Sequence, residues 1–215
     1  MMKMSKPIDV GLKQIKTLLQ KMGGLAMDSI KLSVEAFNKQ EDAHIQIEAW
    51  SNMILILSEE VEDKATELMA LHQPMAKDLR TLRAYIKIAY DIERFGRYAL
   101  DISEIHRTIG PWKTAGEGPS IDELSGRVAR IVALALSLME VEDQSVIWEL
   151  ASVESEIDSL YIKNLKALIE AKDLDPKRII AYALTIRYLE RIADHACYIA
   201  ESMTYAYTGK RITLR

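Results

Sequence analysis

This sequence of 215 residues has few of the residues that interrupt regular structure. It contains nine glycines and five prolines, so long elements are expected rather than many short ones. The single cysteine, Cys197, has no partner in the chain for a disulfide bond, which suits a reducing compartment. Residues 1–7 lack the apolar stretch of a signal peptide. We therefore expect a cytoplasmic protein.

Long apolar runs and an excess of positive charge are also absent. The longest apolar run, near residues 131–139, is far shorter than the about 20 residues that a membrane-spanning helix needs. The net charge is −4. General nucleic-acid binding needs a basic face that displaces counterions from phosphates, so we expect no nucleic-acid partner. Membrane association is expected only through a partner protein.

Apolar residues recur with a helical period along the chain, and no stretch alternates in the manner of a strand. Pro74 suits the first position of one helix, and Asp175 followed by Pro176 suits the start of another. The pattern predicts six long helices, near residues 8–37, 42–71, 74–107, 120–139, 143–171 and 176–207.

The third and sixth predicted helices carry similar sequences. Residues 90–96 (Tyr-Asp-Ile-Glu-Arg-Phe-Gly) align with residues 187–193 (Arg-Tyr-Leu-Glu-Arg-Ile-Ala), which places Glu93 over Glu190. An internal duplication is the simplest explanation. Short turns make neighbouring helices antiparallel, so we predict an all-α fold of two tandem repeated three-helix bundles. The predicted units are a first bundle (residues 1–110), a linker (residues 111–119) and a second bundle (residues 120–215).

Acidic residues interrupt the apolar face of the second half. Glu190 falls on the apolar stripe of its helix, and Asp194 follows one turn later on the same face. Glu154 and Asp158 have the same spacing on the preceding helix, and an antiparallel hairpin brings the two pairs to similar heights. Four buried carboxylates need a neutralising cation, and oxygen ligands suit ions such as Mg, Mn, Fe or Zn. The sequence therefore predicts a metal site at these four residues.

Two features limit this prediction. The alternative to a metal is a pair of salt bridges to Arg187 and Arg191. The first half does not repeat the pattern, because the positions facing Glu93, from Ser51 to Leu55, hold no carboxylate. Arg97 stands where the second half has its second acidic residue. We expect no metal in the first bundle, with Arg97 as an internal ion-pair partner of Glu93 and of Asp101.

Three other residues that could bind a metal have ordinary structural interpretations. His195 points about 100° away from Asp194 on a helix of 3.6 residues per turn, so we interpret it as a surface or interface residue. Cys197 is interpreted as a small buried residue. Ferritin-like di-iron bundles need two Glu-x-x-His motifs, whereas this chain has one, from Glu41 to His44. We interpret it as a solvated pair near a helix start.

Several stretches resemble signature motifs of the PhoU family. Residues 73–80 (Gln-Pro-Met-Ala-Lys-Asp-Leu-Arg) resemble the family's Q-P-x-A-x-D-L-R turn. Residues 189–196 (Leu-Glu-Arg-Ile-Ala-Asp-His-Ala) and 199–201 (Ile-Ala-Glu) are similar to its L-E-R-I-G-D-H-A and I-A-E signature. Residues 205–209 loosely resemble its terminal Y-x-x-x-G. The resemblance covers essentially the whole chain, including the duplication.

The resemblance implies a function that the residue pattern alone does not give. PhoU proteins are built from two three-helix bundles and bind metal clusters, often iron or zinc, through E(D)-x-x-x-D motifs. They repress phosphate uptake by contacting the phosphate ABC transporter and, in bacteria, a sensor kinase. Family members often form dimers. Carried over position by position, the ligands of an iron, zinc or manganese ion are Glu154, Asp158, Glu190 and Asp194.

We therefore expect a regulator of phosphate uptake and phosphate-responsive signalling, with the transporter's ATPase or a sensor protein as its partner. A homodimer is expected, and enzymatic activity is not. Two alternatives stay open. The chain could be an adaptor for a different ion transporter. It could also be a metal-dependent carboxylate-bundle enzyme, which needs an open coordination position and a nearby base, and the sequence offers no clear base.

Overall fold

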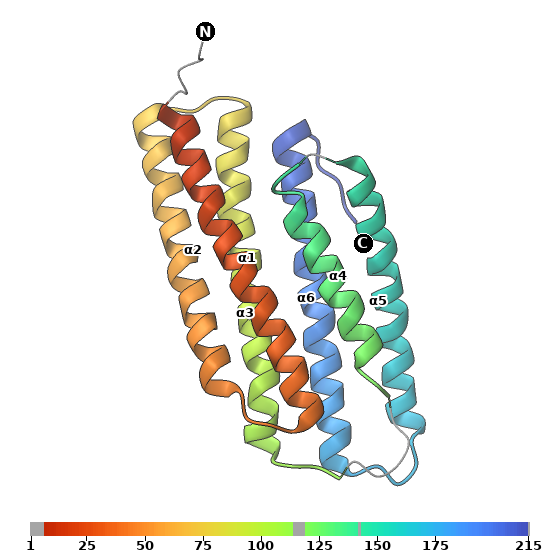
Figure 1. Cartoon of the computed structure of the whole chain (residues 1–215). Coiled ribbons are helices and arrows are strands. Elements are labelled where there is room, and N and C mark those ends of the chain that lie inside the picture. Colours follow the sequence, from red (N-terminus) through yellow and green to blue (C-terminus); the bar gives the residue numbers. More distant parts are fainter. Residues whose placement is uncertain (1–6, 114–118, 142, 215) are drawn as a thin grey trace.

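The computed structural model of the chain contains six helices among the residues that it describes (Figure 1). The structure describes residues 7–113, 119–141 and 143–214, and these contain no strand. Within these ranges, no helix combines the length and the apolar content that a bilayer crossing requires. The predicted all-α fold is confirmed, and the predicted bounds lie within one turn of the observed ones. The helices are α1 (Pro7–Lys39), α2 (His44–His72), α3 (Lys77–Ile109), α4 (Asp122–Ser137), α5 (Gln144–Glu170) and α6 (Pro176–Thr208).

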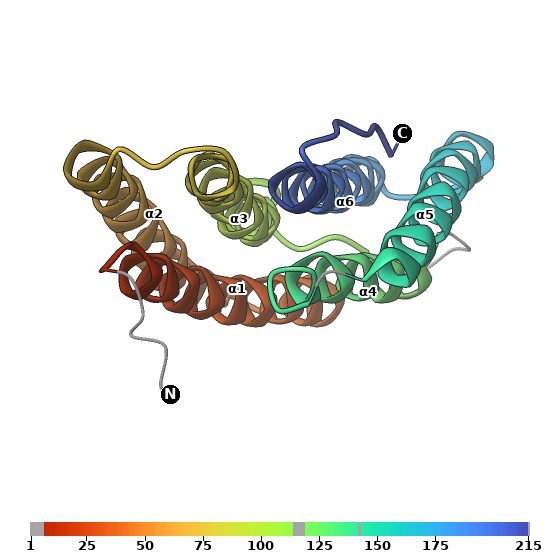
Figure 2. The ribbon, with the colours of Figure 1, turned by 90° about the horizontal axis from the view of Figure 1, so that it is seen from above.

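The helices form two groups of three that lie side by side. One group is α1, α2 and α3, and the other is α4, α5 and α6 (Figure 1). In Figure 2, α3 and α6 lie together at the centre, α1 and α4 lie together along one side, and α2 and α5 occupy the two outer edges. The interface between the halves is therefore made by α3 with α6 and by α1 with α4.

The buried apolar side chains form one contiguous cluster that extends through both halves. In α1, Ile15, Leu19 and Met22 are fully buried, and their spacing of four and then three residues places them on one helix face. Phe95 of α3 and Ile192 of α6 are also fully buried. Burial of such a side chain stabilises the fold by about 1.5–3 kcal/mol. The two bundles therefore share a single core.

The start of α6 follows the sequence prediction. The Asp175 carboxylate accepts a hydrogen bond from the backbone N–H of Lys177 at 3.0 Å, and Pro176 occupies the first helical position. Asp175 also accepts from the backbone N–H of Lys113 at 3.0 Å. These two bonds, the one from Lys113 first, hold the pKa of Asp175 below its ordinary value. One aspartate thus caps α6 and fastens the connection between the halves.

The prediction that Pro74 begins the third helix is wrong. α3 begins at Lys77, and the connection before it contains two residues with positive φ, Gln73 at 43° and Ala76 at 48°. A left-handed residue ends a helix and turns the chain away from its axis. Pro74 therefore lies in the turn between α2 and α3 rather than in the helix.

The described part of the predicted linker packs against the first half. Trp112 is buried, and its ring centroid lies 5.2 Å from that of Phe37. Its backbone N–H donates to Gln40 Oε1 at 2.9 Å. Residues 114–118 of the linker lie outside the described residues. The connection is therefore anchored to the first half as far as Trp112.

Candidate functional site

The acidic residues predicted on α6 are paired with arginines of the same helix. Arg187 Nη1 lies 2.9 Å from Glu190 Oε2, and Arg191 Nε lies 3.4 Å from the same oxygen. Arg191 Nη1 lies 3.0 Å from Asp194 Oδ2. The spacing of three residues from Arg187 to Glu190 and from Arg191 to Asp194 places each arginine beside its carboxylate. The glutamate and aspartate side chains are only 14% and 12% exposed.

The acidic residues predicted on α5 differ from each other in their surroundings. Glu154 is buried at 7% exposure, whereas Asp158, one turn later, is exposed. Val153 and Ile157 carry the buried apolar face of this part of α5. Glu154 lies at the margin of that face, and Asp158 faces solvent.

Two of the four predicted ligands, Glu190 and Asp194, are therefore engaged with arginines in this arrangement. Carboxylate oxygens suit hard cations, but the guanidinium groups of Arg187 and Arg191 already neutralise two of the four. Among the described residues, no group of three or more histidine, cysteine, aspartate or glutamate side chains could hold a metal ion. The salt bridges that were the alternative to a metal are present. Metal binding at these four residues stays a prediction.

Among the described residues, the first half has no acidic cluster equivalent to that of α6. Of the two partners predicted for Arg97, only Asp101 agrees with the structure. No salt bridge joins Arg97 to Glu93 within the described part of the chain, and Arg97 is exposed. Arg97 acts instead on Asp101, whose pKa is raised by burial and lowered in part by the charges of Arg97 and Arg94. Arg97 therefore faces solvent beside Asp101 rather than the core beside Glu93.

A different acidic residue lies at the interface between the two halves. His195 Nδ1 of α6 lies 2.8 Å from Asp91 Oδ1 of α3, and Asp91 is 1% exposed. An ionised carboxylate can only accept, so Nδ1 is the donor. Asp91 Oδ2 is also buried and has no hydrogen-bond partner. This bond connects the two halves of the chain through side chains that were not paired by the sequence prediction.

The surroundings of this pair determine its charge. Burial raises the pKa of Asp91 above its ordinary value, while the hydrogen bond and charge of His195, followed by the charge of Lys87, oppose that rise. Aromatic rings enclose the imidazole, with centroids 5.3–6.2 Å from it: Tyr90, Tyr98 and Tyr198. The prediction of His195 as a surface or interface residue is confirmed, and the structure shows that the interface is the one between α3 and α6.

The duplication places a second contact opposite this one. When Glu93 is aligned with Glu190, Asp91 falls over Tyr188 and Tyr98 falls over His195. Tyr98 and Tyr188 stack across the same interface, with ring centroids 6.0 Å apart. Equivalent positions thus hold a hydrogen-bonded ionisable pair in one place and an aromatic pair in the other.

Sequence reasoning missed Asp91 because it followed one apolar stripe of the third helix, the stripe that contains Glu93. α3 packs against α1 and α2 on one side and against α6 on another, so its buried surface is broader than one stripe. Asp91 lies three residues after Ile88 and four before Phe95, and both are fully buried. That spacing is the signal that could have found it.

Two other sequence interpretations have different outcomes. Cys197 is buried, as expected. The interpretation of Glu41 and His44 as a solvated pair is wrong, because His44 is only 7% exposed. Its ring packs beneath α3, with Nδ1 3.2 Å from Ser103 Oγ and Nε2 3.3 Å from Glu104 Oε1. The first turn of α2 therefore packs against α3 instead of facing solvent.

The fold and these features define a class, the all-α proteins built from a repeated three-helix unit. Residues 19–105 and 121–203 each match the family model described as the PhoU domain. One match falls in each half of the chain. The chain therefore belongs to the PhoU family.

Full-length relatives and solved structures agree with this assignment. A Synechocystis protein named "Phosphate-specific transport system accessory protein PhoU homolog" is 30% identical, with coverage of 93% of this chain and 91% of the relative. A protein of the same name from Clostridium acetobutylicum is 26% identical, with coverage of 97% and 98%. The crystal structure of the phosphate transport system regulatory protein PhoU from Streptococcus pneumoniae superposes with a TM-score of 0.86 at 20% identity, covering 95% of this chain and 99% of that one. The PhoU structure from Pseudomonas aeruginosa gives 0.82 at 24% identity, with coverage of 94% and 99%. The fold is thus that of PhoU proteins.

Proposed function

We propose that this chain is an accessory regulator of a phosphate-specific transport system, and that it restrains phosphate uptake in the cytoplasm by contact with the transporter's ATPase subunit. The observation that carries the proposal is the match of both halves to the PhoU domain. Relatives named as accessory proteins of phosphate-specific transport support it, because they align over nearly their whole length. The proposed action is binding rather than catalysis.

A protein that acts by contact needs a surface that a partner can cover. Trp148, Ile162 and Ile169 of α5 are 71%, 49% and 83% exposed. Their spacing by multiples of seven residues places them on one face of the helix, and α5 lies at an outer edge of the molecule (Figure 2). Large exposed apolar side chains on one helix face are available to a partner, and tryptophan is enriched among residues that dominate binding energy. We assign the transporter contact to this face of α5.

Deletion of the gene tests the proposed role. Cells that lack the chain should take up phosphate without restraint in phosphate-rich medium, and expression of the intact chain should restore the restraint. Uptake of labelled phosphate and expression of phosphate-responsive genes are the measurements. Unchanged uptake together with unchanged gene expression in the deletion strain would contradict the proposal.

Two matched variants test the assigned surface. Ile169 on α5 and Ile45 on α2 are both 83% exposed, so a charge placed at either should leave the fold intact. Ile169→Asp should fail to restore the restraint on uptake, because it puts a carboxylate into an apolar contact. Ile45→Asp should restore it. If both variants restored the restraint on uptake, the transporter contact would not lie on this face of α5.

A further inference from the structure

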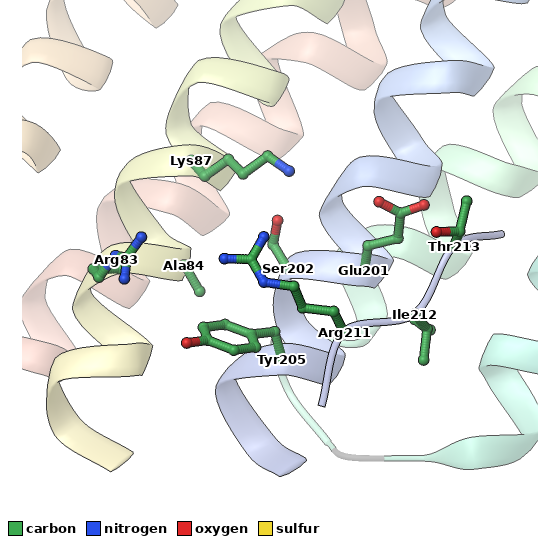
Figure 3. Close-up of a pocket in the computed structure, with 9 residues that line it drawn as sticks. All are labelled: Arg83, Ala84, Lys87, Glu201, Ser202, Tyr205, Arg211, Ile212 and Thr213. Atoms are coloured by element: carbon green, nitrogen blue, oxygen red, sulfur yellow. The ribbon is translucent and has the colours of Figure 1, made fainter. Parts of the chain in front are cut away.

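A basic pocket lies where α3, α6 and the C-terminal segment 210–214 meet (Figure 3). The cavity has a volume of about 320 Å³, at the lower end of the range of small-molecule sites. Its cationic residues are Arg83 and Lys87 of α3 and Arg211 of the C-terminal segment. Figure 3 shows the Lys87 ammonium and the Arg211 guanidinium pointing into the space between α3 and α6.

The C-terminal segment is held in place by its own contacts. Gly209 ends α6 with φ of 73°, and a Cβ at this position would lie 3.5 Å from Arg80 Cζ. A left-handed glycine reverses the chain, which brings residues 210–214 back along α6. Glu201 Oε1 then accepts a hydrogen bond from the backbone N–H of Leu214 at 3.1 Å. The segment that carries Arg211 is therefore anchored at both ends.

The pocket also holds one carboxylate, that of Glu201, and the charge of Lys87 acts on the buried Asp91. No salt bridge to Arg83, Lys87 or Arg211 occurs in the described ranges of the chain. Arg211 lies over the ring of Tyr205, 5.3 Å from its centroid, and Lys87 lies over another tyrosine ring at 5.4 Å. These contacts orient the cations without neutralising them. A protein of net charge −4 thus concentrates positive charge in one cavity.

The fold itself does not require these cations. With Glu93 aligned on Glu190, Arg83 and Lys87 fall over Ile180 and Leu184 of α6, so the same helix positions accept apolar residues in the other half. Like charges four residues apart on a helix also destabilise it by a few tenths of a kcal/mol. The packing of the helices therefore does not account for the positive charge of the pocket.

We propose that this pocket binds a small phosphate-bearing anion. Arginine presents a planar fork of donors that matches phosphate oxygens, and lysine adds a point charge. The three cations exceed the single carboxylate of the pocket by two positive charges, which matches a ligand that carries two negative charges. The inference does not rest on the proposed role in phosphate uptake, because the ligand can bind whether or not the chain contacts a transporter.

Calorimetric titration of the purified full chain in a phosphate-free buffer tests the pocket. The probes are inorganic phosphate and pyrophosphate, with sulfate as the comparison anion. The wild type should bind at least one phosphate probe more tightly than sulfate, and binding should weaken as salt is raised. Binding of inorganic phosphate identifies free phosphate as the ligand. Binding of pyrophosphate alone identifies a condensed or esterified phosphate, and either result supports the proposal.

Two double variants of equal charge make the test specific to the pocket. Arg83→Gln with Lys87→Gln removes two cations from the pocket, and these side chains are exposed, so the thermal transition should be retained. This variant should bind the phosphate probe at least tenfold more weakly. Arg97→Gln with Lys172→Gln removes two exposed cations elsewhere and should bind like the wild type. Equal weakening in both variants, equal affinity for sulfate, or no binding by the wild type would overturn the proposal.

Discussion

Two contacts at equivalent positions of the α3–α6 interface have different chemistry. One is the buried Asp91–His195 hydrogen bond of 2.8 Å, and the other is the stacked pair Tyr98–Tyr188 with centroids 6.0 Å apart. α3 and α6 lie alongside each other at both places because the apolar spacings of the two helices are repeated. The repeated helices therefore determine the positions at which side chains meet across the interface, but not the identity of those side chains.

The same contrast extends along the two central helices. Arg83 and Lys87 of α3 line the basic pocket, while the equivalent Ile180 and Leu184 of α6 are exposed apolar residues. One end of the interface therefore attracts anions, and the equivalent end does not. Because these positions are exposed, the two halves can present different surfaces while their buried core stays the same.

The largest expected effects come from positions where the two halves are alike. Phe95 and the equivalent Ile192 are both fully buried. Phe95→Ala should lower the free energy of unfolding by about 3–5 kcal/mol and Ile192→Ala by about 2–5 kcal/mol, because each leaves a cavity. Since the core is contiguous, denaturant unfolding should show one transition that either variant shifts. Two transitions, with each variant shifting only one of them, would show that the two halves unfold independently.

A smaller effect should distinguish the two interface contacts. His195→Leu removes the hydrogen bond to a buried carboxylate, so it should lower the free energy of unfolding by about 2–3 kcal/mol. Tyr188→Leu removes a ring contact worth about 0.5–1.5 kcal/mol beyond its buried area. Denaturant titration of both variants near neutral pH measures the difference. Equal losses would mean that the polar pair has no special role.

The pH dependence of stability tests the charge of Asp91. Burial raises the pKa of Asp91 above its ordinary value of 3.8, so the folded chain binds this proton more tightly than the unfolded chain does. The associated stability is fully present below the ordinary value and is lost as the pH rises through the raised pKa. The Asp91→Asn variant has no ionisable group at this position, so it does not lose this stability. The loss in the wild type is about 1.4 kcal/mol for each unit by which the pKa of Asp91 is raised.

The difference in unfolding free energy between Asp91→Asn and the wild type should therefore move in favour of the variant as the pH rises from acid to neutral. Thermal unfolding at a series of pH values measures it, and Asp101→Asn provides a half-buried carboxylate with a raised pKa for comparison. Parallel pH profiles for wild type and Asp91→Asn would show that the pKa of Asp91 is not raised.

The smallest effects on stability are expected at the arginine pairs of α6. Arg191 is 35% exposed, so Arg191→Gln should cost about 1 kcal/mol or less. Elemental analysis of the wild type and of a double variant, Glu190→Ala with Asp194→Ala, decides whether these carboxylates serve only as ion-pair partners or also bind a metal. The pairs predict equal, negligible metal in both proteins. Iron, zinc or manganese that is lost in the variant would establish the metal site instead.

Much of this fold could be predicted from the sequence, because helical periodicity depends on local spacing. The six helices, the duplication and the Asp175 cap follow from it. The position of Pro74 could not be predicted, since it depends on the positive φ of Gln73 and Ala76. Burial of His44 likewise depends on where α2 packs against α3.

The candidate sites were harder to predict than the fold. The burial of Asp91 can be predicted only if it is known that α3 packs against α6. The apolar stripe of α3 alone does not give that packing. The basic pocket unites α3 with the C-terminal segment, so Arg83 and Arg211 meet only after Gly209 reverses the chain. The carboxylates of α6 were identified correctly as partly buried, but their arginine partners decide their chemistry.

The proposed contact with the transporter is tested most directly by the binding of the purified chain to the purified ATPase subunit of the phosphate transporter. We expect saturable binding that Ile169→Asp weakens at least tenfold and that Ile45→Asp leaves unchanged. Absence of binding by the wild-type chain would contradict the proposed contact.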